Sequence, residues 1–368
     1  MILFLYIFIL LLNLICVISN NKNKIVLLLS VIAMIVIMGG NNINSDFEAY
    51  KYFYERQTYP SSMEPGFVFV AKLFSQLGIE YQLFTTVVFS IGIIGLTLLA
   101  VKKTNIPHFV IIMYMLTMIF LDTVQIRQFI VYVLFAIALN ELSLGRKKRY
   151  TIIILLGGLF QYTILVYLPL VLVDINKERS RRFIRSFVVT VFVLCVFVFV
   201  AGNRIPYIDI IMARFIDSSK IVYFTSRTRF GFLKYFVFQF VSMYLIAVER
   251  EYLIEYGMDE IKQYAKATYI AIMYTCVVMP LLMLNNNFYR FFRFGIIPIS
   301  ICTAEIIYDM KCVRKEKGEG RMIHVTNKLR GRYKEFVFLV FLFIICYGLL
   351  MQSTNVAKEV IYNNILLS

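Results

Sequence analysis

The sequence is poor in charged residues, in histidine and in recognisable enzyme motifs. Only 16% of its 368 residues are charged, whereas a soluble domain is usually about a quarter charged. Its two histidines and six cysteines show no metal-type or paired spacing, and it has no phosphate-binding glycine loop and no Gly-x-Ser-x-Gly motif. These absences argue against a soluble protein, a disulfide framework and a serine hydrolase, and we expect neither a metal nor a cofactor.

Long apolar runs dominate the chain instead. Hydrophobic residues make up 60% of it, and runs of roughly 18 or more, enough to cross a bilayer, recur along its length. The first run lacks the basic start and cleavage site of a signal peptide, so we expect it to be a retained span. The pattern predicts one integral membrane domain, residues 1–368, of the all-α polytopic class with about ten transmembrane helices. The predicted spans are residues 2–19, 25–39, 81–101, 106–121, 126–143, 183–202, 233–248, 265–284, 288–308 and 336–351.

Basic clusters separate these spans and predict the orientation of the protein. The net charge is +16, and Lys and Arg in short loops stay on the cytoplasmic side of a membrane. We therefore attribute the excess charge to topology and expect no nucleic-acid partner. With every cluster in the cytoplasm, both termini are external, and the external loops lie at about 40–80 and 203–232. The clusters are residues 22–24, 102–103, 146–149, 177–185 and a cytoplasmic loop at about 310–335.

One apolar segment, residues 151–173, lies between two of these clusters. At ~1.5 Å per residue it can make a single span of the ~30 Å core, which would put one cluster outside the cell. The alternative is a re-entrant, broken helical hairpin, with Gly157, Gly158 and Gln161 near the break and Pro169 on the returning arm. We predict the hairpin, because it keeps both clusters in the cytoplasm. Broken backbone at membrane depth must be covered by protein or line a cavity, so we also expect a polar cavity near Gln161.

Several acidic residues and arginines lie where the membrane topology alone does not explain them. Asp46 and Glu48 fall in the first external loop, among tyrosines that could form an interfacial aromatic belt. Asp46 could instead cap a short helix that starts at Phe47. Asp122 and Arg127, five residues apart at an external junction, could pair with each other or face a cavity.

Arginines at the predicted outer face suggest an anionic ligand. Arg290 and Arg293 are three residues apart and would share one face at the outer end of a helical span, where positive charge is normally scarce. Arg204 belongs to the basic external loop. A lipid diphosphate or an acidic sugar would suit these guanidinium groups. Because neither histidine is expected outside, external chemistry must depend on carboxylates, arginines, tyrosines and amides.

Three short motifs resemble the EpsG family of bacterial exopolysaccharide proteins, which are similar to Wzy-type O-antigen and capsule polymerases. They are an aspartate with a tyrosine four residues on (Asp46 and Tyr50), Glu-Pro-Gly-Phe at 64–67, and Gln-Ile-Arg-Gln at 125–128. The resemblance is clearest from about residue 40 to 175 and returns at Tyr289. The family tends to have a histidine in the broken segment, and here Gln161 stands there. Gln cannot act as a base, although it can hydrogen-bond a glycan.

The resemblance implies a multi-pass protein of the bacterial inner membrane that joins undecaprenyl-diphosphate-linked repeat units at its outer face. Asp46 is then the expected base for the attacking hydroxyl, with Glu48 or Glu64 as substitutes, and Arg127 and Arg290 are the expected catalytic cations. A flippase and a chain-length regulator are possible partners. The remaining substrate-binding candidates are Tyr50, Tyr52, Glu64, Asp122, Gln128, Gln161, Arg204, Tyr289 and Arg293.

Two other functions fit parts of the same pattern. A glycosyltransferase that takes sugar from a polyprenyl monophosphate resembles this chain in having an acid-x-acid pair, Asp46 and Glu48, in the first external loop. Many such enzymes need a divalent metal. A flippase for lipid-linked oligosaccharides is the second alternative, but transporters usually show paired halves, and the sequence has no internal repeat and two sizeable external loops.

Overall fold

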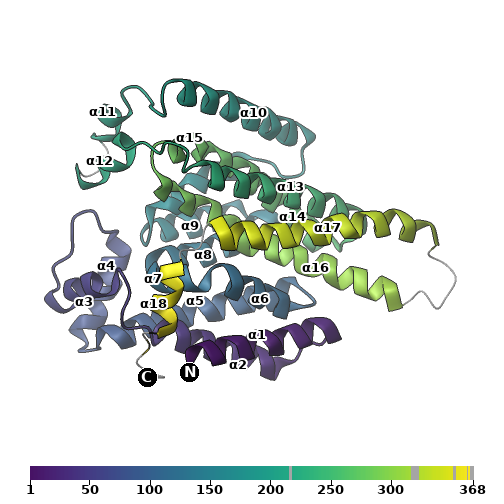
Figure 1. Ribbon diagram of the computed structural model, residues 1–368, viewed down its shortest axis with the longest axis horizontal. Helices are drawn as coiled ribbons and strands as arrows, with labels where there is room; N and C mark the ends of the chain where they lie inside the picture. The colour runs from purple at the N-terminus through teal and green to yellow at the C-terminus, as the bar shows by residue number, and fades with distance from the viewer. Residues whose placement is uncertain (215–217, 316–322, 351–353, 363, 365–368) are drawn as a thin grey trace.

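The computed structural model describes residues 1–368 apart from 215–217, 316–322, 351–353, 363 and 365–368. Throughout that part, the protein is helical and has no strand, only an isolated antiparallel bridge between Asn41 and Asn364. Most of the long helices run side by side, and shorter helices lie at one end of the bundle (Figure 1). The predicted all-α polytopic class is confirmed.

The first half of the chain runs from α1 to η1. Prolines open α4 and α6, where the missing N–H is not needed, and the Asn23 side chain caps α2. The elements are α1 (Ile2–Ser19), α2 (Lys24–Gly39), α3 (Phe47–Arg56), α4 (Pro65–Gln76), α5 (Tyr81–Lys103), α6 (Pro107–Thr117), α7 (Ile119–Val124), α8 (Ile126–Ser143), α9 (Lys147–Gly158) and the 3₁₀ helix η1 (Tyr162–Leu172).

The second half supplies the most deeply buried helices. In the apolar segment Asn286–Met310, which combines η3 with most of α16, 89% of the most apolar window is buried, against 28% for α1. The elements are α10 (Glu178–Val200), α11 (Ile208–Met212), α12 (Ser218–Thr225), α13 (Leu233–Tyr256), α14 (Asp259–Tyr274), η2 (Thr275–Val278), α15 (Met279–Leu282), η3 (Asn286–Gly295), α16 (Ile296–Lys315), α17 (Ile323–Leu350) and α18 (Thr354–Tyr362).

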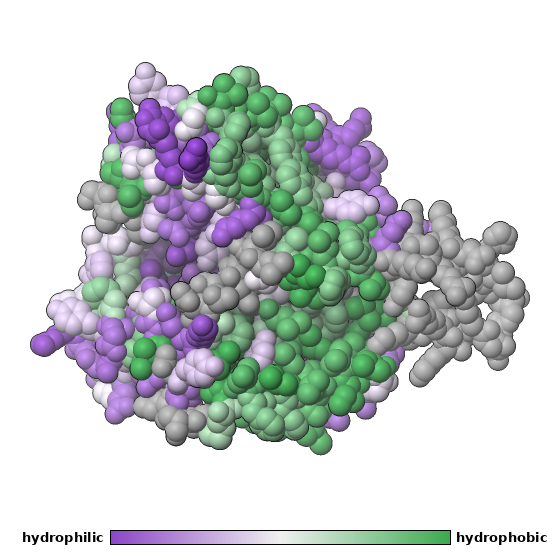
Figure 2. All heavy atoms as spheres, in the orientation of Figure 1, coloured by the Kyte–Doolittle hydropathy of each residue, from purple (hydrophilic) through white to green (hydrophobic). Residues whose placement is uncertain are grey.

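Six segments of the described chain are long and apolar enough to cross a membrane, and four apolar helices are shorter. The shorter ones are Lys24–Gly39, Pro107–Thr117, Tyr162–Leu172 and Glu335–Gly348. In Figure 2, apolar side chains cover the middle of the visible face, and polar side chains gather at the end that carries α3 and α4. A multi-pass membrane protein is therefore confirmed, while ten spans stays a prediction.

The segment from Lys147 to Leu172 folds back on itself, as predicted. The Tyr150 hydroxyl of α9 donates a hydrogen bond to the Tyr167 carbonyl oxygen of η1, at 2.5 Å. Nearer the break, a Cβ added to Gly158 would lie only 2.5 Å from the Leu165 side chain, so glycine lets the two arms meet. Each arm has 11 or 12 residues, too few to span a ~30 Å core. The hairpin therefore enters and leaves at the same end of the bundle.

The predicted cytoplasmic clusters at 102–103, 146–149 and 177–185 gather at that same end, which we call the basic end. Residues 316–322 of the predicted cytoplasmic loop at about 310–335 lie outside the described residues. The Asn176 backbone N–H, together with the nearby charges of Lys177 and Lys147, lowers the pKa of Asp174, so the two ends of the hairpin are neighbours. Lys103, at the end of α5, forms an ion pair of 3.1 Å with Glu260 at the start of α14. We call the opposite end, with α3, α4 and α18, the α3 end.

Cysteine labelling tests whether both arms of the hairpin leave on one side of the membrane. Lys148→Cys and Arg179→Cys place single exposed cysteines on either side of it, in a background without native cysteines. We expect a membrane-impermeant reagent added outside to label neither, because both basic clusters belong in the cytoplasm. Ser61→Cys, in the loop between α3 and α4, is the control and should be labelled. External labelling of one of the first two positions would contradict the hairpin topology.

Candidate functional site

Asp46 immediately precedes α3, but its side chain does not cap the helix. It occupies the N-cap position with φ −103° and ψ −14° and makes no capping hydrogen bond, whereas a capping residue usually adopts the extended region. The turn is held by Asn44, whose Oδ1 accepts a hydrogen bond of 3.0 Å from the Asp46 backbone N–H. The capping alternative is therefore wrong, and the half-buried Asp46 carboxylate is left for another role.

Charged groups from three distant parts of the chain act on the Asp46 carboxylate. Burial raises the pKa of Asp46, the charges of Arg290 and Arg127 lower it, and the charge of Glu359 raises it again. The net result is a raised pKa. These groups come from η3, α8 and α18, so the fold gathers two guanidinium groups and a second carboxylate around Asp46. A carboxylate of raised pKa near cations is suited to accept a proton.

Arg127, in the Gln-Ile-Arg-Gln motif, contacts residues of the other two motifs. Its Nε donates a hydrogen bond of 2.7 Å to the Tyr50 hydroxyl, and its Nη1 bonds to the Glu64 carboxylate. The guanidinium also lies over the rings of Tyr50 and Phe67, at 5.3 and 5.9 Å from their centroids. Because Glu64 is almost completely buried, most of the Arg127 charge is neutralised locally. Arg127 thus holds α3, α4 and α8 together beside Asp46.

The Glu-Pro-Gly-Phe motif binds the break in the hairpin. Glu64 Oε1 accepts a hydrogen bond from the Tyr162 backbone N–H at 3.4 Å. The N–H groups of Gly66 and Phe67 both donate to the Leu159 carbonyl oxygen, at 2.8 and 3.2 Å. A Cβ on Gly66 would lie 2.7 Å from the Leu159 Cβ, so a larger residue would push the break away. The motif therefore satisfies backbone groups that the broken helix leaves unpaired.

Two glutamine side chains also lie at the break in the hairpin. Gln128 of α8 hydrogen-bonds Thr163 of η1 through its Nε2, at 3.1 Å. Gln161 is half-buried at the N-cap of η1 and makes no side-chain capping bond. Polar groups therefore do gather at the break, and the cavity expected near Gln161 stays a prediction.

Asp122 and Arg293 form a second, fully enclosed cluster. Arg293 Nη2 bonds to the Asp122 carboxylate, and neither side chain is exposed at all. Arg293 Nη1 also donates to Gln125 Oε1 at 2.9 Å, and the Tyr114 hydroxyl donates to Asp122 Oδ2 at 3.2 Å. Asp122 thus pairs with Arg293 and not with Arg127. Both charges are enclosed and paired with each other, although Arg293 Nε has no hydrogen-bond partner within the described residues. Contact of either residue with a substrate stays a prediction.

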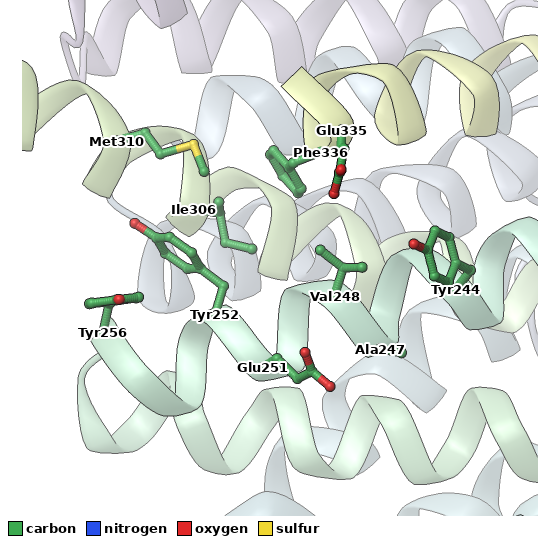
Figure 3. Close-up of a pocket in the computed structure, with 10 residues that line it drawn as sticks. All are labelled: Tyr244, Ala247, Val248, Glu251, Tyr252, Tyr256, Ile306, Met310, Glu335 and Phe336. Carbon is green, nitrogen blue, oxygen red and sulfur yellow. The ribbon is translucent and has the colours of Figure 1, made fainter. Parts of the chain in front are cut away.

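Three hollows of the structure differ in size and place. The crevice at Asp46, lined also by Asn41, Asn44 and Tyr50, has a volume of about 10 Å³, enough for one water molecule. A larger cavity, of about 220 Å³, lies between α13, α16 and α17, where Tyr252 and Glu251 line it (Figure 3). The larger cavity contains none of the motif residues. A third, more open groove of about 820 Å³ is lined by Glu48 and Glu55 of α3. Of these three hollows, the small crevice is the one lined by Asp46.

A comparison with known protein families shows which family the chain belongs to. A family model described as the EpsG family matches residues 24–317, which is most of the chain. The chain belongs to the EpsG family. No curated protein and no solved structure matches the sequence. EpsG-family membership indicates a membrane polysaccharide polymerase of the glycosyltransferase type, and the resemblance seen in the sequence is confirmed.

The EpsG-family motifs come together at the α3 end, but four other candidates lie apart from them. Glu48 is exposed and lines a separate groove with Glu55. Tyr52 is also exposed, by 58%, and Tyr289 stacks on Tyr235 with 5.3 Å between ring centroids. Arg204 is exposed between α10 and α11, and no ion pair among the described residues includes it. The structure gives these four no contact with Asp46.

Sequence reasoning missed several residues that the fold adds to this site. Glu359, Asn41 and Asn44 were not predicted, and Gln125 was recognised only as part of a motif. Asn41 and Asn44 were detectable, since they lie in the polar stretch just before Asp46. No motif in the sequence pointed to Glu359, which lies outside the family-matched residues 24–317. No group of three or more His, Cys, Asp or Glu that could hold a metal ion occurs within the described ranges.

Proposed function

We propose that this EpsG-family protein joins undecaprenyl-diphosphate-linked oligosaccharide repeat units into a surface polysaccharide at the outer face of the bacterial inner membrane. The observation that carries the proposal is the uncapped, half-buried Asp46 carboxylate within reach of the Arg290 and Arg127 charges. The gathering of basic clusters at the opposite end supports an external α3 end, since Lys and Arg favour the cytoplasmic side.

In the proposed reaction, Asp46 takes the proton of the acceptor sugar hydroxyl. The hydroxyl oxygen then forms a bond to the anomeric carbon of the donor unit, and the bond from that carbon to the lipid diphosphate breaks. The diphosphate leaves with the electron pair and gains negative charge. A nearby guanidinium stabilises this charge, because its planar fork matches phosphate oxygens and stays protonated.

Arg290 is the better placed of the two arginines for the diphosphate. Arg127 is already bonded to Glu64 and Tyr50, so its remaining role is to hold the base and the hairpin in place. Arg290 has no ion pair within the described residues, and its Nε is buried without a hydrogen-bond partner there. An anionic group of the substrate would satisfy that donor. Tyr50, which lines the crevice, and Gln161, at the break in the hairpin, are candidates for contacts to the sugar.

The surface glycan of a strain that lacks this gene tests the proposal. Loss of the polymerase should leave a single repeat unit on the carrier or its acceptor, because units are still made and moved across the membrane. Expression of the intact gene should restore the long chains. Complete loss of the repeat unit would instead indicate a flippase. Polymerisation by the purified protein should survive EDTA, and inhibition by EDTA would favour a metal-dependent glycosyltransferase.

A further inference from the structure

The last described helix, α18, returns to the α3 end although it lies outside the family-matched residues. It packs against α7 and α2, and Figure 1 shows it beside α7. Asn41 Nδ2 donates to the Glu359 carbonyl oxygen at 3.3 Å, and Asn364 Nδ2 donates to the Val36 carbonyl oxygen at 2.9 Å. Val360 is completely buried in this contact. These contacts fix the chain at Glu359 and just after it, at Val360 and Asn364.

A short chain of hydrogen bonds connects α18 to Asp46. Asn44 Nδ2 donates to Asn41 Oδ1 at 2.7 Å, and Asn44 Oδ1 accepts from the Asp46 backbone N–H at 3.0 Å. Asn41, Asn44 and Asp46 line the same crevice. Because Asn41 also bonds to the Glu359 backbone, the positions of the two acidic residues are set by one network.

Two of the groups whose charges act on Asp46 have a polar atom with unmet hydrogen-bonding capacity. Glu359 Oε2 is buried and accepts no hydrogen bond from the part of the chain that the structure describes, and Arg290 Nε is buried and donates none. Orphaned buried polar atoms are costly and are rare unless a ligand or water satisfies them. One is an acceptor and the other a donor. A sugar hydroxyl would satisfy the first, and a phosphate oxygen would satisfy the second.

We propose that Glu359 is a second substrate-binding carboxylate of this site, accepting a hydrogen bond from a hydroxyl of the acceptor sugar beside Asp46. The inference rests on the proposed polymerase function and extends it to a residue outside the family match. Two carboxylates can orient a sugar by two hydroxyls, which fixes the attacking oxygen relative to the base. The helix α18 then forms one wall of the acceptor site.

The charge of Glu359 also predicts a change in the pH profile of the reaction that a purely structural role would not cause. Its negative charge raises the pKa of Asp46, so replacing it with a neutral side chain should lower that pKa. If ionised Asp46 is the base, the acidic limb of the pH profile should then move to lower pH. The charged groups that act on Asp46 are Arg290, Arg127 and Glu359, and the charge of Asp46 in turn acts on Tyr50 and Tyr81.

Glu359→Gln in the full-length protein tests the inference. Gln keeps the size of the side chain and leaves the backbone bond to Asn41 intact, so α18 should stay docked. We expect polymerisation of lipid-linked units to fall about tenfold or more, since a hydrogen bond to a charged group is lost, and the acidic limb to shift to lower pH. Glu55→Gln, an exposed glutamate of α3, is the matched control and should change neither.

The outcomes separate the two claims. A wild-type rate and an unmoved acidic limb in Glu359→Gln would overturn the assignment of Glu359 while leaving the polymerase function intact. Failure of the wild-type protein itself to lengthen lipid-linked units would overturn the proposed function, and the inference would fail with it. The position of the acidic limb does not depend on how much folded protein the variant yields, so reduced expression cannot imitate the expected shift.

Discussion

The Asp46→Asn variant should be well folded and should produce only the single-repeat glycan. Asn keeps the size of the side chain, and the backbone N–H that bonds to Asn44 is unchanged. It cannot take a proton from the acceptor hydroxyl, however, and loss of a general base reduces a rate by about 10²-fold or more. The chain-length ladder of the surface glycan and the rate of the purified protein measure the effect.

Two controls distinguish the loss of a catalytic base from general damage to the protein. Glu55→Gln removes a carboxylate from the same helix, away from the crevice, and should keep the full ladder. Asp46→Asn should also keep the thermal midpoint of the wild-type protein, since the Asp46 side chain makes no capping bond. Long chains from Asp46→Asn at normal expression would show that Asp46 is not the base.

Asp122→Asn should destabilise the protein strongly without acting on the chemistry directly. It removes the only acidic partner of Arg293 among the described residues, and leaves a fully buried guanidinium without a counter-charge. Removing one partner of a buried ion pair typically costs about 3–5 kcal/mol. We expect a large fall in the thermal midpoint of the detergent-purified protein, measured by size-exclusion chromatography after heating.

A second variant separates the lost charge from general damage to the core. Asp122→Leu combined with Arg293→Met removes both charges, and an apolar replacement of a buried pair is often neutral or stabilising. The double variant should therefore recover much of the lost thermal midpoint. Asp209→Asn, at an exposed position in α11, is the matched control and should leave it unchanged. A wild-type midpoint for Asp122→Asn would contradict the buried pair.

The sequence by itself predicted most of the long apolar helices and favoured a hairpin over a single span for one segment. Residues 151–173 are too few for two spans and are flanked by basic clusters, and helix length and charge are local quantities that need no tertiary information. The break directly follows Gly157 and Gly158, the small residues at the end of α9 that allow close contact of the arms. The motif residues Asp46, Glu64 and Arg127 were also identifiable, because their spacing resembles that of a known family.

Only the tertiary structure decided which charges pair. Asp122 and Arg127 are close in sequence, but the helix breaks at Gln125 and sends their side chains to different partners, Arg293 and Glu64. Buried charges must find counter-charges wherever the packing places them, and sequence separation does not limit that choice.

Packing also decided how deeply each arginine of η3 is buried and where the C-terminal helix α18 lies. Arg290 and Arg293 share a face of η3, but at ~2 Å per residue of a 3₁₀ helix Arg293 lies about 6 Å further along the axis. That displacement encloses Arg293 completely and leaves Arg290 partly accessible. Glu359 reaches Asp46 because α18 docks on α2 and α7, and such long-range docking depends on surfaces that exist only after the bundle has formed.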